Sequence, residues 1–174
     1  IVIFTSIFWV LLNLKKGKKN IFFLNKKDNY FFYFLFIMIF FQIILGAFVS
    51  GLDAGRLYQT WPLMNFNYFP DDVLINNFKD FFNFNNHGLV QFYHRNLAYL
   101  ISIYIVIAGL YIYINDIKKI IKPFNYVILI LVFQIILGIT TLTSGLNIYL
   151  ASTHQIFSLL LILSVINLYY EYIK

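Results

Sequence analysis

The sequence predicts an all-α integral membrane protein, a four-transmembrane-helix bundle made of two parallel-repeated helical hairpins. Of the 174 residues, 61% are hydrophobic and only 11% are charged, whereas about a quarter of residues are charged in soluble domains. The mean hydropathy is +0.76. Several apolar runs reach the length of about 20 helical residues that crosses a bilayer. One hexapeptide, Phe-Gln-Ile-Ile-Leu-Gly, occurs twice, which indicates an internal repeat.

Four apolar runs predict the spans, at residues 30–50, 89–114, 123–144 and 149–172. The run at 1–14 is too short to span and lacks the order of features of a signal peptide. We interpret it as the end of a truncated transmembrane helix, and the chain as a C-terminal fragment. A basic cytoplasmic or matrix loop follows at 15–29. Residues 30–174 are expected to form the bundle, with an outside lid loop at 51–88.

The formal net charge of +6 is explained by membrane topology better than by nucleic-acid binding. Lysines gather in short loops between the spans, and the positive-inside rule places such loops in the cytoplasm or matrix. The connections at 51–88 and 146–148 then face outside. With no cysteine in the chain, disulfides and thiol catalysis are excluded. The lysines that carry the argument are Lys15, Lys16, Lys18, Lys19, Lys26, Lys27, Lys118, Lys119, Lys122 and Lys174.

The two copies of the hexapeptide lie at 41–46 and 133–138, in the first and third spans. Both spans run outward, so the repeat is parallel. In each case the returning helix carries a histidine near its outer end, His94 or His154. Two hairpins of one design are expected to be related by an axis along the membrane normal, as in other duplicated membrane proteins.

The long outside connection is expected to be ordered and functional, because loops of this length rarely lack a role. From Pro70 onward, Leu74, Phe78, Phe81 and Phe82 fall on one helical face, and Asp residues stand at a capping position. This pattern predicts a short amphipathic helix in the outer interface.

His94 and His154 are the strongest functional candidates, because an imidazole inside a span is costly without a partner. Both lie five residues into their expected helices and hence at similar depth. Two imidazoles facing each other across a bundle could be the axial metal ligands of a haem iron. The alternative is a pair of buried, hydrogen-bonded imidazoles.

Small residues next to these histidines would leave room for a flat macrocycle. Ala98 and Ser158 follow the histidines by one turn, on the same helical face. Gly46 and Gly138 are expected to do the same on the repeat helices. Small residues also allow close helix packing without any cofactor, and for the glycines that alternative stays open.

Three further polar residues have less specific readings. Arg95 could pair with a haem propionate, since a guanidinium binds a carboxylate in a two-pronged fashion, or reach lipid headgroups. His87 lies in polar loop sequence and is expected to be solvated. Asp53, between two glycines, is expected to cap a turn.

At this point the motifs resemble a known family. The segments GAFVSGLDAG at 46–55, YQTWPLM at 58–64, VQFYHR at 90–95, QIILGITTL at 134–142 and ASTHQ at 151–155 are similar to the C-terminal half of haem A synthase of the mitochondrial and proteobacterial type. The resemblance covers most of the chain from residue 30 onward. Arg56 and Tyr93 depart from the family's usual residues. The second departure weakens the idea that a carboxylate there orients the ligand.

The resemblance implies two similar four-helix bundles, and an oxidoreductase that converts the C8 methyl of haem O to the formyl of haem A for cytochrome c oxidase assembly. It implies that His94 and His154 ligate a haem b with an electron-transfer role. The catalytic glutamate would lie in the N-terminal half, so this stretch contains no catalytic residue and is expected to be inactive alone.

The implied partners are the lipid bilayer, haem O, the N-terminal half of the same protein, haem O synthase and an electron donor, in a bacterial inner (plasma) membrane or the mitochondrial inner membrane. Two alternatives belong to other classes. A stand-alone b-type cytochrome would need only the bundle and its haem. A small transporter using the histidines as proton relays would need polar residues deeper in the spans.

Overall fold

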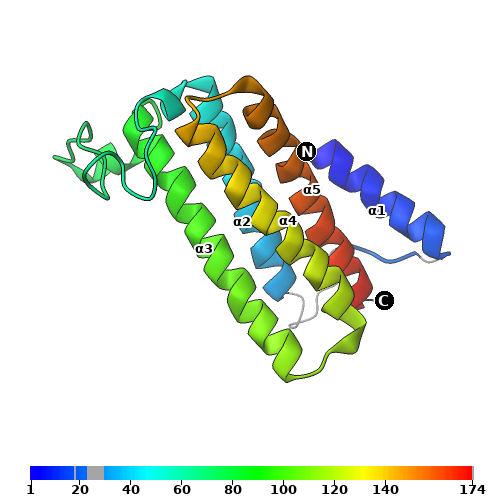
Figure 1. The fold of residues 1–174 in the computed structure, drawn as a ribbon. Coiled ribbons are helices and arrows are strands. Elements are labelled where there is room, and N and C mark those ends of the chain that lie inside the picture. Colours follow the sequence, from blue (N-terminus) through cyan, green and yellow to red (C-terminus); the bar gives the residue numbers. More distant parts are fainter. Residues whose placement is uncertain (18, 23–29, 174) are drawn as a thin grey trace.

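The computed structural model describes residues 1–17, 19–22 and 30–173 (Figure 1). The described ranges are helical and contain no strand, and four of the helices are long and apolar enough to cross a membrane. The predicted all-α, four-span fold is therefore confirmed, and the chain is a multi-pass membrane protein. The α-helices are α1 (Val2–Lys16), α2 (Tyr30–Gly51), α3 (His87–Ile114), α4 (Lys118–Thr143) and α5 (Ile148–Ile173).

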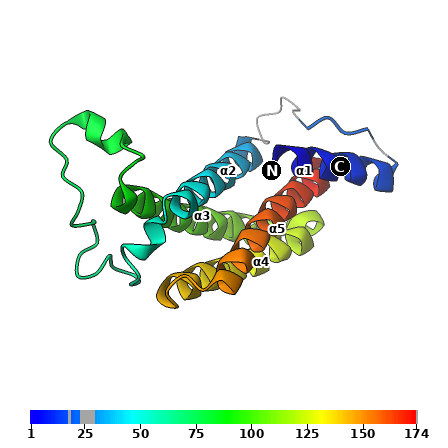
Figure 2. The same ribbon diagram turned by 90° about the horizontal axis from the view of Figure 1, so that it is seen from above.

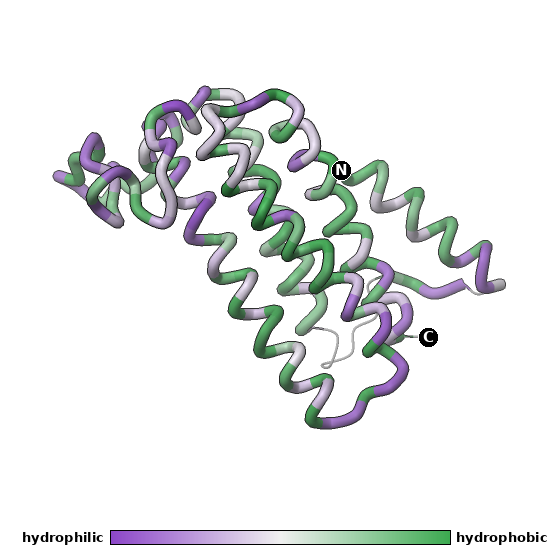
Figure 3. Tube along the Cα trace, in the orientation of Figure 1, coloured by the Kyte–Doolittle hydropathy of each residue, from purple (hydrophilic) through white to green (hydrophobic). Residues whose placement is uncertain are grey.

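Neighbours in sequence form the two hairpins: α2 packs against α3, and α4 packs against α5 (Figures 1 and 2). The pairs meet through α2 with α5 and α3 with α4. We call the end with residues 115–122, which contains Lys118, Lys119 and Lys122, the lysine-rich end. The end with residues 51–86 is called the loop end. Hydrophilic residues gather mainly at these two ends (Figure 3).

Three helices begin earlier than predicted, α5 by a single residue. α3 starts at His87 because the side chain of Asn86 accepts a hydrogen bond from the Leu89 N–H at 2.9 Å and so caps the helix. α4 starts at Lys118 and contains Pro123. Proline removes one backbone hydrogen bond, and so close to the helix start the ladder continues around it.

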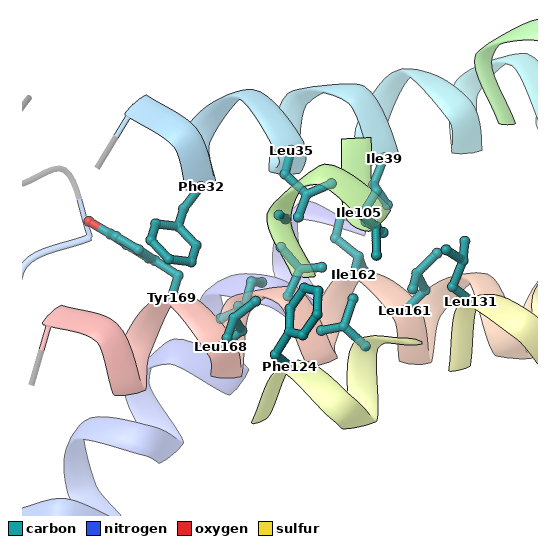
Figure 4. Close-up of a cluster of buried hydrophobic side chains, with 14 of the residues drawn as sticks. Phe32, Leu35, Ile39, Ile105, Phe124, Leu131, Leu161, Ile162, Leu168 and Tyr169 are labelled. Atoms are coloured by element: carbon teal, nitrogen blue, oxygen red, sulfur yellow. The ribbon is translucent and has the colours of Figure 1, made fainter. Parts of the chain in front are cut away.

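Among the described residues, the main apolar cluster lies in the lysine-rich half of the bundle, and Figure 4 shows part of it. In this half all four long helices bury bulky side chains against one another, which closes the space between the hairpins. The core members drawn from these helices include Phe32, Leu35, Ile39, Ile101, Ile105, Ile112, Phe124, Val127, Leu131, Leu161, Ile162, Val165, Leu168 and Tyr169.

Helix α1 lies beside α5 and extends the core on one side (Figures 1 and 2). The rings of Trp9 and Tyr169 stack with centroids 5.8 Å apart, and Lys16 Nζ lies 3.0 Å from Glu171 Oε1. The apolar run at 1–14 is thus helical, as expected, but α1 is not among the candidate spans.

The long connection differs from the prediction. It contains two short 3-10 helices, η2 (Ala54–Arg56) and η3 (Phe78–Phe82), and no amphipathic α-helix from Pro70. The reason is local capping. Asp80 Oδ2 accepts the N–H groups of both Asn76 and Asn77 at 2.8 Å, which starts the helical turn only at residue 78.

The chain around η3 projects sideways past the beginning of α3 in both views (Figures 1 and 2). Its apolar side chains are exposed, with Leu74 at 79% and Phe78 at 76%. By contrast, η2 packs against α2 and α3, and Leu146 from the short connection touches Gly55. Closure of the whole segment as a lid remains a prediction.

The core predicts a stability difference between two phenylalanine truncations. Phe124 is fully buried, whereas Phe41 is 53% exposed. We expect Phe124→Ala to lower the free energy of unfolding by about 3–5 kcal/mol, because it leaves a cavity, and Phe41→Ala to have little effect. Thermal denaturation in detergent measures both. Equal loss in the two variants would contradict the assigned core.

Candidate functional site

The stripe of each long helix that faces the bundle changes character between its two halves. Residues spaced three or four apart lie on one helical face. On α4 this stripe is bulky in the lysine-rich half, with Phe124, Val127 and Leu131 buried, and becomes Gln134 and Gly138 toward the loop end. The other helices follow the same rule: Leu35, Ile39, Gln42 and Gly46 on α2; Ile105, Ile101, Ala98 and His94 on α3; Val165, Leu161, Ser158 and His154 on α5.

Both histidines therefore lie on bundle-facing stripes, about two turns from the loop ends of their helices. Each side chain is half-buried. His94 and His154 thus come from different hairpins and lie on stripes that face the bundle. Their approach to each other as a ligand pair remains a prediction.

His94 is held by the first copy of the repeated hexapeptide. Gln42 Nε2 lies 3.2 Å from Nδ1 and 3.4 Å from Nε2 of His94, and donates to the His94 carbonyl oxygen at 3.0 Å. A Cβ added to Gly46 would lie only 3.1 Å from Cε1 of the same ring. The glycine therefore makes room for the imidazole itself.

His154 has the same surroundings in the second copy. Gln134 Nε2 lies 3.4 Å from His154 Nε2, and a Cβ added to Gly138 would lie 3.0 Å from Cε1 of the ring. Each hexapeptide thus supplies one glutamine and one glycine to the histidine of the next helix. This shared contact explains why glutamine and glycine recur at the same places in both copies.

Several buried polar atoms at the loop end have no hydrogen-bond partner within the described part of the chain. They include Oε1 of Gln42 and of Gln134, Nδ1 of His154 and Nε of Arg95. An unsatisfied buried polar group costs about 1–3 kcal/mol. Such a group of atoms indicates a place where a further polar partner belongs, next to the two imidazoles.

Ala98 and Ser158 are half-buried on the same stripes as the histidines. The Ser158 hydroxyl donates to the Gln155 carbonyl at 2.7 Å, within its own helix. Its polarity is therefore satisfied locally, as is common for serine in apolar helices. Both positions present little bulk to the bundle.

Arg95 fastens the loop to α3. Its Nη2 donates to the Tyr58 carbonyl at 2.9 Å and its Nη1 to the Leu63 carbonyl at 3.2 Å. Gln91 Nε2 donates to the same Tyr58 carbonyl at 2.8 Å. Both terminal nitrogens thus bind the loop backbone, which leaves neither free for a two-pronged contact with a propionate or a lipid headgroup.

The Tyr58 side chain closes a second contact. Its hydroxyl donates to Asp72 Oδ1 at 2.6 Å, and burial together with this hydrogen bond raises the pKa of Tyr58 above its ordinary value. Asp72 lies against Gly88, where any side chain would collide with the carboxylate. A carboxylate is favourable there because α3 begins at this point.

The remaining candidates fall outside this arrangement. His87 is exposed at the first turn of α3. Asp53 occupies the N-cap position of η2 with φ 52°, but its side chain makes no capping bond and lies 3.9 Å from Arg56 Nε. Tyr93 donates to the Phe81 carbonyl at 2.7 Å and so holds the loop.

The donor set limits the metal chemistry. Within the described ranges, no group of three or more His, Asp or Glu side chains could hold a metal ion. Two imidazoles alone leave a bare ion with too few ligands. A pair of histidines suits an iron whose other ligands come from a macrocycle, as in bis-imidazole haem proteins.

Comparison with known proteins identifies the family. The model of the COX15-CtaA family, described as cytochrome oxidase assembly protein, matches residues 1–166. The chain is 42% identical over 168 residues to the haem A synthase of Pelagibacter ubique, which covers 95% of this chain. This chain belongs to the haem A synthase family. No solved structure matches it.

Other haem A synthases are similar over shorter stretches. That of Rickettsia bellii is 43% identical over 139 residues, or 79% of this chain, and that of Wolbachia pipientis wMel is 38% identical over 133 residues, or 76%. The chain spans 48%, 40% and 36% of the lengths of the Pelagibacter, Rickettsia and Wolbachia relatives, respectively.

Sequence reasoning about this haem A synthase family member missed the contacts of Gln42, Gln134, Gln91 and Tyr58. Glutamine within an apolar span was an available signal, since polar side chains in bilayers usually bind a neighbouring helix. The contact between Tyr58 and Asp72 had no such signal, because both residues lie in an irregular loop.

The Arg95 contacts predict protection of the loop from proteases. A hydrogen bond from a charged group contributes about 1.5–3 kcal/mol, so Arg95→Gln should raise the rate of chymotrypsin cleavage within residues 51–86 about tenfold or more. Arg56→Gln is the matched control, since that side chain is exposed. Equal cleavage rates in the two variants would show that Arg95 does not fasten the loop.

Proposed function

We propose that this chain is the haem b-binding bundle of a haem A synthase, with His94 and His154 as the two axial ligands of the iron. In this proposal the whole enzyme oxidises the C8 methyl of haem O to the formyl group of haem A, for cytochrome c oxidase assembly. The bundle conducts electrons between an electron donor and the reacting haem, which the N-terminal half of the enzyme would bind.

One observation carries the proposal: the two hairpins repeat the same arrangement of glutamine, glycine and histidine around a shared interior. Gln42 and Gly46 contact His94, and Gln134 and Gly138 contact His154. A macrocycle has two similar faces and one central metal. Two equivalent walls, each with one imidazole, match that symmetry better than they match an asymmetric substrate.

The residues present also fit the cofactor chemically. His154 Nδ1 is a buried ring nitrogen without a hydrogen-bond partner among the described residues, so it can bind or orient a ligand. The partly buried Ile43, Leu97, Ile135 and Leu159 pack against the edge of the core. They supply apolar surface next to the imidazoles, as the edge of a porphyrin requires.

When bound, haem supplies reversible one-electron redox chemistry. Two histidine ligands on one haem iron would suit electron transfer rather than oxygen binding. His94 and His154 would hold the iron from the two hairpins, and the core in the lysine-rich half would exclude water on that side. Arg95, whose Nε is buried and unpartnered among the described residues, would be the partner of a propionate.

The proposal places the protein in a bacterial inner membrane or a mitochondrial inner membrane, with the loop end facing outside. The lysine-rich ends of the helices support this orientation by the positive-inside rule. Haem O synthase is the enzyme that would supply the substrate.

Removal of either imidazole tests the ligand assignment. We expect the full chain, purified in detergent, to show a low-spin b-type signal in its reduced-minus-oxidised spectrum. His94→Ala and His154→Ala should each abolish this signal, because each leaves one axial position without a protein ligand. His87→Ala is the control, because His87 is exposed and should leave the spectrum unchanged. A low-spin signal that survives His154→Ala would overturn the assignment.

Added bulk at the two repeat glycines should disturb the same signal. A Cβ at Gly46 or Gly138 would force the imidazole to move by a few tenths of an ångström, whereas Gly51 has open space around it. We expect Gly46→Ala and Gly138→Ala to convert part of the low-spin haem to high-spin, measured by electron paramagnetic resonance of the oxidised protein. Gly51→Ala should match the unchanged chain. Identical spectra for all three variants would contradict the proposed packing.

A further inference from the structure

The two glutamines of the repeated hexapeptide contact the proposed ligands but have no role in the function described so far. Gln42 and Gln134 occupy the same place in the two copies, and each turns its carboxamide toward one imidazole. We propose that Gln42 and Gln134 are positioning residues that orient His94 and His154 for metal ligation through hydrogen bonds to the imidazole rings. This inference rests on the proposed function and deepens it.

Imidazole chemistry gives the reason for such a partner. A neutral imidazole that binds a metal through one nitrogen carries a proton on the other, and that N–H requires an acceptor. Oε1 of Gln42 and of Gln134 are buried acceptors without a partner among the described residues. Each belongs to an amide that already touches the ring.

A half-turn of the amide exchanges its oxygen and nitrogen, which have nearly the same shape. The oxygen of Gln134 would then take the position 3.4 Å from His154 Nε2. The oxygen of Gln42 would take the position 3.2 Å from His94 Nδ1, and this turn would give up the bond that its nitrogen donates to the His94 carbonyl. Each glutamine can therefore donate to a ring nitrogen that lacks a proton, or accept from one that carries it.

The two contacts differ in strength. Gln42 also donates to the His94 carbonyl at 3.0 Å, so it is tied to both the ring and the backbone of α3. Gln134 makes only the ring contact, and the second ring nitrogen of His154 has no partner in the described chain. Gln134 can therefore accept from its ring N–H without losing another bond, whereas Gln42 would give up its bond to the His94 carbonyl.

A simpler role for these glutamines is to join helices, since polar side chains often do so in bilayers. Leucine separates the two roles because it keeps the approximate volume and removes the hydrogen bond. Glutamate keeps an acceptor for the ring N–H and makes the imidazole more basic. If the glutamines only join helices, neither the leucine variants, which remove the acceptor, nor the glutamate variants, which strengthen it, should change the haem properties.

The experiment compares Gln42→Leu, Gln134→Leu, Gln42→Glu and Gln134→Glu with the unchanged full chain purified in detergent. Gln155→Leu is the matched control, because Gln155 is exposed next to His154. The readouts are haem affinity by titration, the low-spin signal in electron paramagnetic resonance, and the midpoint potential of the haem.

We expect each leucine variant to lose about tenfold in haem affinity, as for other partners of metal-bound histidines. The midpoint potential should rise, because a less basic imidazole stabilises the oxidised iron less. The glutamate variants should restore the affinity and lower the potential below that of the unchanged chain.

Leucine variants that match the unchanged chain and Gln155→Leu in all three readouts would overturn the inference while leaving the haem site intact. An unchanged chain with no low-spin haem would instead overturn the proposed function, and the inference with it. If a leucine variant is lost from the membrane, the glutamate variants decide: a midpoint potential equal to that of the unchanged chain overturns the inference.

Discussion

The contact between a glutamine–glycine pair on one helix and an imidazole on the next is the interaction on which this site depends. Lipid tails are as apolar as leucine, so helices in a bilayer associate through close van der Waals packing and polar contacts rather than through removal of apolar surface from water. Polar contacts and close approach then decide how helices pair. In both hairpins glycine allows the imidazole to approach, and glutamine gives its nitrogens a partner.

The rest of the fold keeps this contact at a fixed level in the bundle. Bulky stripe residues such as Phe124 and Ile162 close the lysine-rich half, so the hairpins are braced on one side of the histidines only. On the other side, Arg95 and Gln91 hold the Tyr58 carbonyl, and Leu146 touches Gly55. The site between the two hairpins is thus closed by apolar packing on the side of the lysine-rich half and by hydrogen bonds on the side of the loop end.

Spans, hairpins and the placement of His94 and His154 followed from hydropathy, charge and the repeat, because these signals are local and periodic. The amphipathic helix expected from Pro70 did not form, since Asp80 binds the backbone N–H groups of Asn76 and Asn77 and outweighs the apolar spacing. The contact of Tyr58 with Asp72 could not be predicted, because it depends on how an irregular loop folds back. Arg95 could be placed near the outer surface, but the carbonyls that it binds could not be named from its position.

The order of the hairpins along the chain has a consequence for biogenesis. Gln42, Gly46 and His94 all precede α4, so the first wall of the site is complete once α3 has entered the membrane. The second wall exists only after α5, the last helix of the described chain, has been inserted. Ribosomal synthesis therefore delivers an oriented His94 before its counterpart is made, and a two-sided ligand can be enclosed only after α5 has been inserted.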